Sequence, residues 1–220
     1  MKLFSLTAFT CLTAVLLAAA APRLHAQDKE KPDAAPPEEE PAEPQEREQL
    51  SPEDLQQRLK ADAELEKAEV AKMMKVFTTL EGSWTGRETL RYEENRLPEK
   101  SWKDEWEGKF TMGGRYFEMN GQTSGDDLNS AYRWICTYDV ERQGYRAWYF
   151  GDNSQNEYTG KLSSDGKFVI WSIRSANGSE SRFSMKADGN KVKCHGTDTL
   201  VDGSLFSTQS SDYTRKRVEL

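Results

Sequence analysis

A helical pattern gives way to alternating strands at residues 80–86, which read LEGSWTG. Gly82 ends the helix and frees the backbone to turn sharply into a sheet, because glycine adopts conformations that other residues avoid. Trp84 adds a large apolar side chain with one N–H group that needs an acceptor. Gly86 lets another element lie close against the first strand. This stretch therefore predicts the entry into a β-domain.

Beyond Gly82, polar and apolar residues alternate with a period of two, which indicates half-buried strands. Asn-Gly and Asp-Gly pairs separate several of these runs and favour hairpins between neighbours. The predicted strands cover residues 84–92, 102–112, 115–123, 130–138, 145–150, 157–162, 167–173, 181–186, 191–200 and 205–215. Closure removes unpaired sheet edges. We therefore predict an all-β fold, a single up-and-down antiparallel barrel of about ten strands over residues 80–217.

The strand over residues 102–112 shows the alternation most clearly. Trp102, Trp106, Phe110 and Met112 fall on one face, and charged residues fill most of the other. The apolar face must point inward. A barrel wider than eight strands leaves an interior that side chains need not fill.

Aromatic side chains and a few acids are the candidate lining of that interior. The candidates are Trp102, Asp104, Trp106, Glu118, Tyr132, Trp134 and Trp171. An apolar cavity with sparse polar contacts is typical of a small-molecule site. The alternative is that the same residues fill a solid core, and the sequence leaves both interpretations open.

Residues 1–26 have the pattern of a secretory signal peptide. Lys2 gives a positive start, residues 3–21 are uncharged and mostly apolar, and LHA at 24–26 offers a cleavage site. We predict cleavage after residue 26, with Ala20 and Ala21 as alternatives, and export to the periplasm or the cell exterior. A retained anchor is the competing interpretation, because the apolar run approaches the length of a membrane-spanning helix.

An acidic, proline-rich linker follows over residues 27–50. It carries nine acids against three bases and almost no large apolar residue. Such a segment cannot bury enough surface to offset the entropy lost on ordering. We therefore predict a disordered spacer.

One long helix is predicted over residues 51–79, with its regular part ending near Phe77. Ser51 is the cap, Pro52 takes the first helical position, and an acid stands three residues after the cap. The apolar stripe strengthens toward the end of the helix. We expect residues 70–80 to pack on the barrel mouth, and the first half to project from the barrel or bind a partner.

Charge and cysteine content restrict the partners and the redox chemistry. The formal net charge is −7, which argues against a nucleic-acid partner. Beyond the signal only Cys136 and Cys194 remain. They fall on the fourth and ninth predicted strands, which are not neighbours, so we expect two buried thiols rather than a disulfide.

Residues 80–86 also resemble the opening of the calycin barrels, the group of lipocalins, fatty-acid-binding proteins and nitrobindins. With GGRY at 113–116, YD at 138–139 and YTRK at 213–216, the chain more closely resembles a bacterial family of secreted, lipocalin-like domains without an assigned function. The resemblance covers about residues 70–217. It implies a calycin-like barrel.

In calycins an arginine near the last strand stacks on the opening tryptophan and closes the barrel. The resemblance therefore implies that Arg215 lies on Trp84 beside Gly82, in a structural role. A guanidinium over an indole contributes on the order of 1 kcal/mol. Nitrobindins hold haem through a histidine on the final strand, whereas His195 lies on the penultimate strand. We therefore predict no haem and no other cofactor.

Motifs for catalysis and metal binding are incomplete. Cys194 and His195 are successive strand residues, so they point to opposite faces. Residues 152–163 have the oxygen spacing of the first half of a calcium loop but lack its glycine and its final acid. No glycine-rich phosphate loop joins a strand to a helix. We predict no metal site. The sequence leaves catalysis undecided, although the incomplete motifs argue against an enzyme.

Three functions are consistent with these patterns. The first is an exported binding protein for a small, partly apolar ligand in the barrel interior. The second is a cell-envelope interaction module with a filled barrel and a partner-binding helix. The third is an enzyme in which Asp104 or Glu118 acts as acid or base inside the barrel.

Overall fold

The structure is a computed structural model that describes residues 51–95, 97–125, 128–152 and 154–216. The predicted signal peptide (1–26) and linker (27–50) lie outside these residues. The elements are α1 (Pro52–Met74), η1 (Lys75–Leu80), β1 (Gly82–Tyr92), η2 (Glu93–Asn95), β2 (Lys100–Thr111), η3 (Met112–Gly114), β3 (Tyr116–Gly125), β4 (Leu128–Asp139), β5 (Gly144–Gly151), β6 (Ser154–Leu162), β7 (Val169–Arg174), β8 (Glu180–Asp188), β9 (Lys191–Thr199) and β10 (Leu205–Arg215). Those labelled η are short 3-10 helices.

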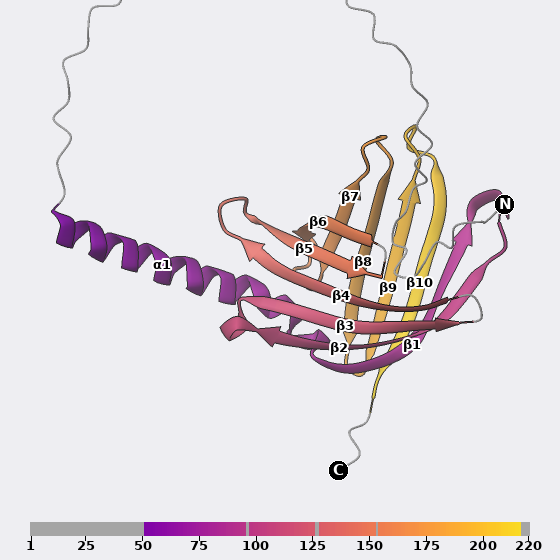
Figure 1. The fold of residues 1–220 in the computed structure, drawn as a ribbon, viewed down its shortest axis with the longest axis horizontal. Helices are drawn as coiled ribbons and strands as arrows, with labels where there is room; N and C mark the ends of the chain where they lie inside the picture. Colours follow the sequence, from indigo (N-terminus) through magenta and orange to yellow (C-terminus); the bar gives the residue numbers. More distant parts are fainter. Residues whose placement is uncertain (1–50, 96, 126–127, 153, 217–220) are drawn as a thin grey trace, which may run out of the picture.

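The ten strands form one closed antiparallel barrel. Each strand pairs with its neighbours in sequence, and β1 pairs with β10 from Trp84–Arg215 to Tyr92–Ser207 (Figure 1). The predicted up-and-down barrel of about ten strands is confirmed. The inner-face assignment of Met112 is wrong: β2 ends at Thr111, and Met112 is exposed in the following turn with a φ of 47°.

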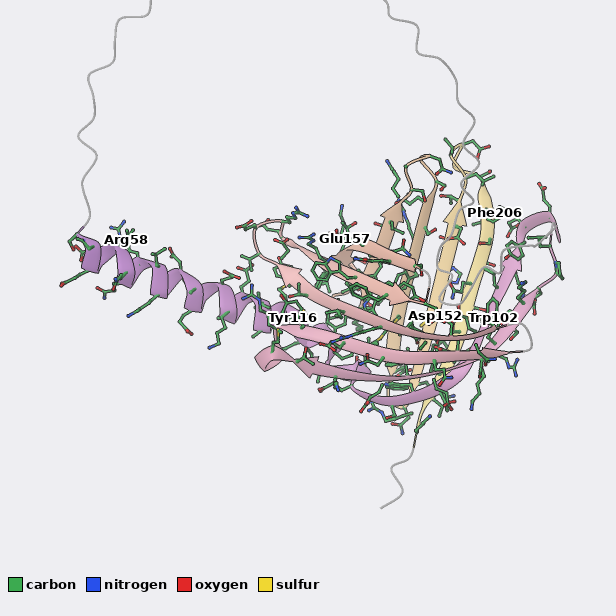
Figure 2. All side chains as sticks on the ribbon, in the orientation of Figure 1. Arg58, Trp102, Tyr116, Asp152, Glu157 and Phe206 are labelled. Carbon is green, nitrogen blue, oxygen red and sulfur yellow. The ribbon has the colours of Figure 1, made fainter. Side chains whose placement is uncertain are left out.

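Helix α1 begins where the sequence predicts. The Ser51 side chain accepts a hydrogen bond from the Asp54 backbone N–H at 3.2 Å, and Pro52 follows the cap. Residues 51–69 are exposed, and α1 extends away from the barrel in Figure 1. Arg58 stands on this projecting part in Figure 2. Within the described residues, no helix combines the length and the apolar character needed to cross a bilayer.

The last turn of α1 and the 3-10 helix η1 close one mouth of the barrel. Met74, Phe77 and Leu80 are buried there, as expected from the strengthening apolar stripe. The Phe77 ring stacks on Phe117 with centroids 5.4 Å apart. The Tyr145 hydroxyl donates to a backbone carbonyl of α1 at 3.0 Å. The buried contacts of the helix with the barrel therefore lie at its C-terminal end.

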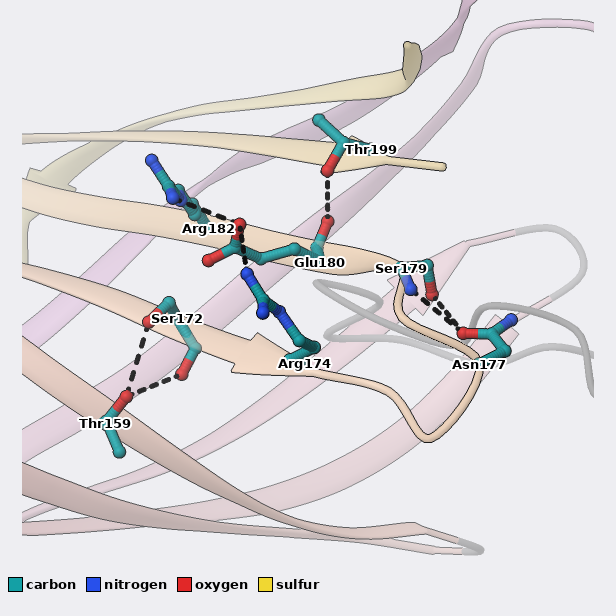
Figure 3. Close-up of polar contacts among 8 residues, drawn as sticks. All are labelled: Thr159, Ser172, Arg174, Asn177, Ser179, Glu180, Arg182 and Thr199. Carbon is teal, nitrogen blue, oxygen red and sulfur yellow. Dashed lines mark hydrogen bonds and ion pairs between the residues drawn. The ribbon is translucent and has the colours of Figure 1, made fainter. Parts of the chain in front are cut away.

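The seam between β6 and β7 is short, with four residue pairs in register. Side chains on the outer surface reinforce it and the next hairpin (Figure 3). The Thr159 hydroxyl lies 3.3 Å from that of Ser172 across the seam. At the β7–β8 turn the Asn177 side chain accepts from the Ser179 backbone N–H at 3.0 Å. This is the Asn-Gly turn that the sequence predicts.

Trp84 and Arg215 join the first strand to the last at the mouth that η1 closes. The Trp84 indole N–H donates to the Leu80 carbonyl at 3.0 Å. The Arg215 guanidinium lies 4.3 Å from the Trp84 ring and donates to the carbonyls of Thr79 and Glu81. Gly82 has a φ of +106°, which other residues rarely adopt.

Replacing Arg215 with methionine should destabilise the barrel. The change removes the guanidinium that covers Trp84 and two charged hydrogen bonds to backbone carbonyls, so we expect a loss of about 2–4 kcal/mol in the free energy of unfolding. Urea unfolding followed by tryptophan fluorescence measures this loss. Arg174→Met is the matched control, because Arg174 is 71% exposed and its ion pair is long; its effect should stay below about 0.5 kcal/mol. Equal effects of the two changes would contradict this role.

Candidate functional site

The barrel interior is aromatic on the side that faces η1. Inward residues of neighbouring strands form one continuous cluster there, with ring centroids 4.8–5.2 Å apart between Trp134 and its closest neighbours. The cluster includes Phe117, Met119, Trp134, Tyr145, Tyr158, Trp171 and Phe183. These side chains come from six strands, and the alternation of each strand turns them inward. This half of the interior is a packed apolar wall.

The interior becomes polar along the strands away from η1. On β1 the inner face passes from Trp84 through Gly86 to Glu88. The buried polar side chains of this half are Glu88, Asp104, Thr123, Ser130, Ser181, Ser207, Gln209 and Ser211. Beyond them, Trp102 packs with Leu90 and Leu128 in a second small apolar cluster. A polar layer thus lies between two apolar ones.

Asp104 is the centre of a buried hydrogen-bond network. Its side chain is fully buried and accepts from the hydroxyls of Thr123 at 3.1 Å, Tyr132 at 3.0 Å and Tyr213 at 2.9 Å. Burial raises the pKa of Asp104, and these hydrogen bonds offset part of that rise. Burial also raises the pKa of both tyrosines well above the usual value. The tyrosines therefore act as neutral donors.

Glu88 is the second interior acid, and its hydrogen bonding is incomplete. It is 1% exposed; Oε1 accepts from the Gln209 amide, whereas Oε2 has no hydrogen-bond partner among the described residues. Burial raises the pKa of Glu88 to about 8, the charge of Asp104 adds to the rise, and the Gln209 hydrogen bond lowers it. A carboxyl with such a pKa is mostly protonated at neutral pH.

A small void borders Glu88. Its volume is about 10 Å³, which is close to the space that one water-sized group needs. Its walls are Glu88, Phe183, Met185, Cys194, His195, Gly196, Gln209, Ser211 and Tyr213. A second void of about 10 Å³ lies beside η1, and its lining residues include Phe77 and Trp171. Both are far smaller than the 300–1,000 Å³ typical of drug-sized ligands, so a larger ligand has to displace side chains.

Most of the sequence-predicted site residues lie inside the barrel. Trp106, Trp134 and Trp171 are buried in the aromatic cluster, while Asp104 and Tyr132 share the polar network. Trp102 lies apart from them in the second apolar cluster. The Trp106 indole N–H has no partner among the described residues. The interior thus contains a buried donor and a buried acceptor without partners.

The placement of Glu118 in the interior is wrong. Phe117 and Met119 are the buried residues of this part of β3, so the strand alternation turns Glu118 outward. Its carboxylate accepts from Arg133 at 2.7 Å and from Thr111 at 2.9 Å on the outer surface. Glu118 therefore cannot act as an acid or base inside the barrel.

Sequence reasoning missed Glu88. It shares the inward parity of Trp84 and Leu90 on the first strand, so the alternation alone could have identified it. Gln209, its hydrogen-bond partner, lies on the last strand, and no local pattern joins the two residues. The pairing of β1 with β10 brings them together.

The cysteines and the histidine have no shared site. Cys136 is buried and Cys194 half-buried, and both are free thiols, as the strand order predicts. His195 is exposed, because Cys194 and Gly196 take the inward positions of β9. An outward histidine does not fit a haem inside the barrel. Within the described residues, no three His, Cys, Asp or Glu side chains form a metal-binding group.

An open groove of about 500 Å³ lies outside the barrel, between α1 and the rim. Its helix wall is Asp62, Leu65, Glu66 and Glu69, and its barrel wall includes Tyr116, Tyr138 and Trp148. Its two arginines already have partners: Arg115 pairs with Glu66 at 2.8 Å, and Arg146 pairs with Glu157. The groove therefore differs from the interior, where the unpartnered polar atoms are.

Comparison with known proteins supports the fold and does not identify the family. No protein-family model matches the chain, and no curated protein matches it. Rv2717c from M. tuberculosis is similar in structure, with a TM-score of 0.50 and 16% identity over 67% of this chain and 99% of that one. The S-type phycobiliprotein lyase CPES from Guillardia theta has a TM-score of 0.50 and 6% identity over 66% of this chain and 93% of its own. Both likenesses are consistent with a calycin-like barrel.

The pKa of Glu88 predicts a pH dependence of stability. It is raised from an ordinary value of 4.5 to about 8, so the folded protein retains a proton that the unfolded chain releases in this range. The contribution of Glu88 to the free energy of unfolding is therefore fully present below about pH 4.5. This contribution is lost as the pH rises from there to about 8. The loss is at most about 1.4 kcal/mol per pH unit.

The measurement is urea unfolding at pH 5, 6, 7 and 8 for the parent protein and two variants. Glu88→Gln should reduce the decline, because it removes one of the two buried carboxyls with a raised pKa, while Asp104 remains. Glu107→Gln is the control: it changes the same functional group on the exposed outer face of β2, so its decline should match that of the parent. A Glu88→Gln profile parallel to the parent profile would contradict the assignment.

Proposed function

We propose that the chain is an exported, lipocalin-like protein that binds a small, partly apolar ligand inside its barrel. The pattern of residues 1–26 supports export, as does the resemblance of residues 70–217 to a secreted family. The single observation that carries the binding proposal is the unpartnered oxygen of the buried Glu88, beside a void and an apolar wall. A buried polar group without a partner destabilises a fold by about 1–3 kcal/mol. We therefore interpret the unpartnered oxygen as a group that binds a ligand.

The arrangement of the interior supports a partly apolar ligand. The walls of the void combine the apolar side chains of Phe183 and Met185 with the polar residues Glu88 and Gln209. Such a combination of apolar walls and a few polar groups is typical of small-molecule sites. Methionine is unbranched and adapts its shape, so Met185 is the wall residue best able to move for a ligand.

N-phenyl-1-naphthylamine, a neutral and largely apolar fluorophore, should bind the full chain saturably with one molecule per chain. Energy transfer from the interior tryptophans to the probe reports the binding. Ser211→Leu should weaken it at least about tenfold, because the larger side chain fills the space beside Glu88. Ser210→Leu is the control: Ser210 is exposed on the same strand, so its variant should bind like the parent.

Circular dichroism establishes that both serine variants are folded. Native mass spectrometry of protein purified from its export compartment provides a second measurement that needs no variant. Equal probe binding by Ser211→Leu and Ser210→Leu, with no small molecule retained in the mass spectra, would overturn interior binding.

A second candidate function, recruitment of a cell-envelope partner, is favoured by one feature of α1. Leu55, Leu59 and Leu65 on the projecting helix are 50%, 60% and 70% exposed. Leu55 and Leu59 are four residues apart and so share one face of the helix, which is the spacing of an apolar surface that packs into the groove of another protein. The two functions involve different parts of the chain and are separable.

Deletion of residues 27–69 separates them. The deleted residues include the linker and the exposed part of α1, while Val70 and the following buried residues remain. Probe binding inside the barrel should therefore be retained within about twofold, a difference smaller than 0.5 kcal/mol. Chemical cross-linking in intact cells, followed by mass analysis, should lose any partner that α1 recruits. Loss of probe binding on deletion would show that the interior depends on the projecting helix.

A further inference from the structure

The void beside Glu88 has the size of a single charged head group. Its volume of about 10 Å³ is close to the requirement of one water-sized group, and an ammonium head is of that size. The residues that line it include the polar Glu88, Gln209 and Ser211 and the apolar Phe183 and Met185. The void therefore fits a small polar head attached to an apolar body.

The charge balance around this void favours a cation. Asp104 raises the pKa of Glu88 through its negative charge, and neither carboxyl makes an ion pair with a described lysine, arginine or histidine. The other titratable groups near them are Tyr132, Tyr149, Tyr213 and Cys194, which are neutral when protonated and anionic when not. His195 also borders the void, but it is exposed and has the outward parity of β9. Glu88 can therefore ionise beside Asp104 at neutral pH only when a positive charge joins it.

The hydrogen-bond inventory also favours a donor. Asp104 already accepts three side-chain hydrogen bonds, and the Glu88 Oε1 accepts from Gln209. The Glu88 Oε2 is the buried oxygen without a partner, and it becomes an acceptor once the carboxyl has lost its proton. An ammonium group has three donors and no acceptor, so it satisfies this oxygen and supplies the missing charge together.

We propose that the ligand is a small organic amine, whose ammonium group occupies the void and binds Glu88 while its apolar body packs against Phe183 and displaces Met185. This inference rests on the proposed function, because it specifies the ligand of the same interior site. An alcohol or amide satisfies the oxygen but supplies no positive charge to stabilise the Glu88 carboxylate. A carboxylate ligand adds a negative charge beside the two buried acids. A divalent metal ion lacks ligands, since no group of three His, Cys, Asp or Glu side chains exists within the described residues.

Binding of the ammonium is coupled to one proton. The Glu88 carboxyl holds a proton below about pH 8 in the empty protein. The bound cation stabilises the carboxylate, so this proton leaves to solvent as the amine binds and the net charge of the site stays the same. Affinity should therefore rise with pH, by at most about tenfold per unit between pH 6 and 8. Above the pKa of the amine itself the trend reverses.

The test compares three probes of one shape on the full chain by isothermal titration calorimetry: 2-phenylethylamine, 2-phenylethanol and 3-phenylpropanoate. We expect the amine to bind at least about tenfold more tightly than the alcohol at pH 7.5, and the carboxylate more weakly than both. Glu88→Gln should reduce amine affinity to that of the alcohol and leave the alcohol unchanged. Glu107→Gln, on the outer face, should bind all three like the parent protein.

A measurement on the parent protein alone guards against a folding defect in Glu88→Gln. Titrations at pH 7 in buffers of different ionisation enthalpy count the protons released, and the proposal requires a release close to one per amine bound. Equal affinities for amine and alcohol, an amine affinity that Glu88→Gln leaves unchanged, or no proton release would each overturn the amine assignment.

The fluorophore distinguishes this failure from failure of the proposed function. If the three probes fail to bind while N-phenyl-1-naphthylamine binds and Ser211→Leu weakens it, interior binding stands and the amine assignment is overturned. If neither the fluorophore nor the amine binds the parent protein, the proposed function and this inference are both overturned.

Discussion

The pairing of β1 with β10 is the interaction on which the rest of the structure depends. It joins the first strand to the last over Trp84–Arg215 to Tyr92–Ser207, and so removes the two edges that an open sheet would expose. Closure also fixes which side of each strand is inside. Every second residue of ten strands must then face an enclosed space, whatever its polarity. The burial of Glu88 and Asp104 follows from this geometry rather than from local preference.

Much of the fold could be predicted from the sequence, because period-two alternation and turn chemistry are local signals. The strand that contains Trp102 and Trp106, the cap at Ser51 and the turn at Gly178 all act within a few residues. The closing contact of Arg215 with Trp84 spans the whole domain, and only resemblance to a known barrel group pointed to it. Strand ends were less certain, since Met112 continues the alternation in sequence but belongs to a turn.

The candidate site was only partly predictable, for two separate physical reasons. Glu118 was assigned to the interior by its strand and not by its face, although Phe117 and Met119 already occupy the inward positions. Glu88 was overlooked although it shares the inward parity of Trp84 and Leu90, because the first strand was assigned to a face by its apolar residues alone. The partnership of Glu88 with Gln209 and the void beside them depend on side-chain packing across the closed sheet. Sequence periodicity carries no information on either.

The buried acids lower the stability of the barrel, and they lie between the two apolar layers that stabilise it. The aromatic cluster beneath η1 and the contact of Trp84 with Arg215 stabilise one end of the barrel, and the Trp102 cluster stabilises the other. The carboxyls lie between these layers, where water cannot compensate them and no described base does so. Apolar side chains of similar volume would give a more stable barrel. Structural demands alone therefore do not account for Glu88, and this is the reason for proposing a ligand inside the barrel.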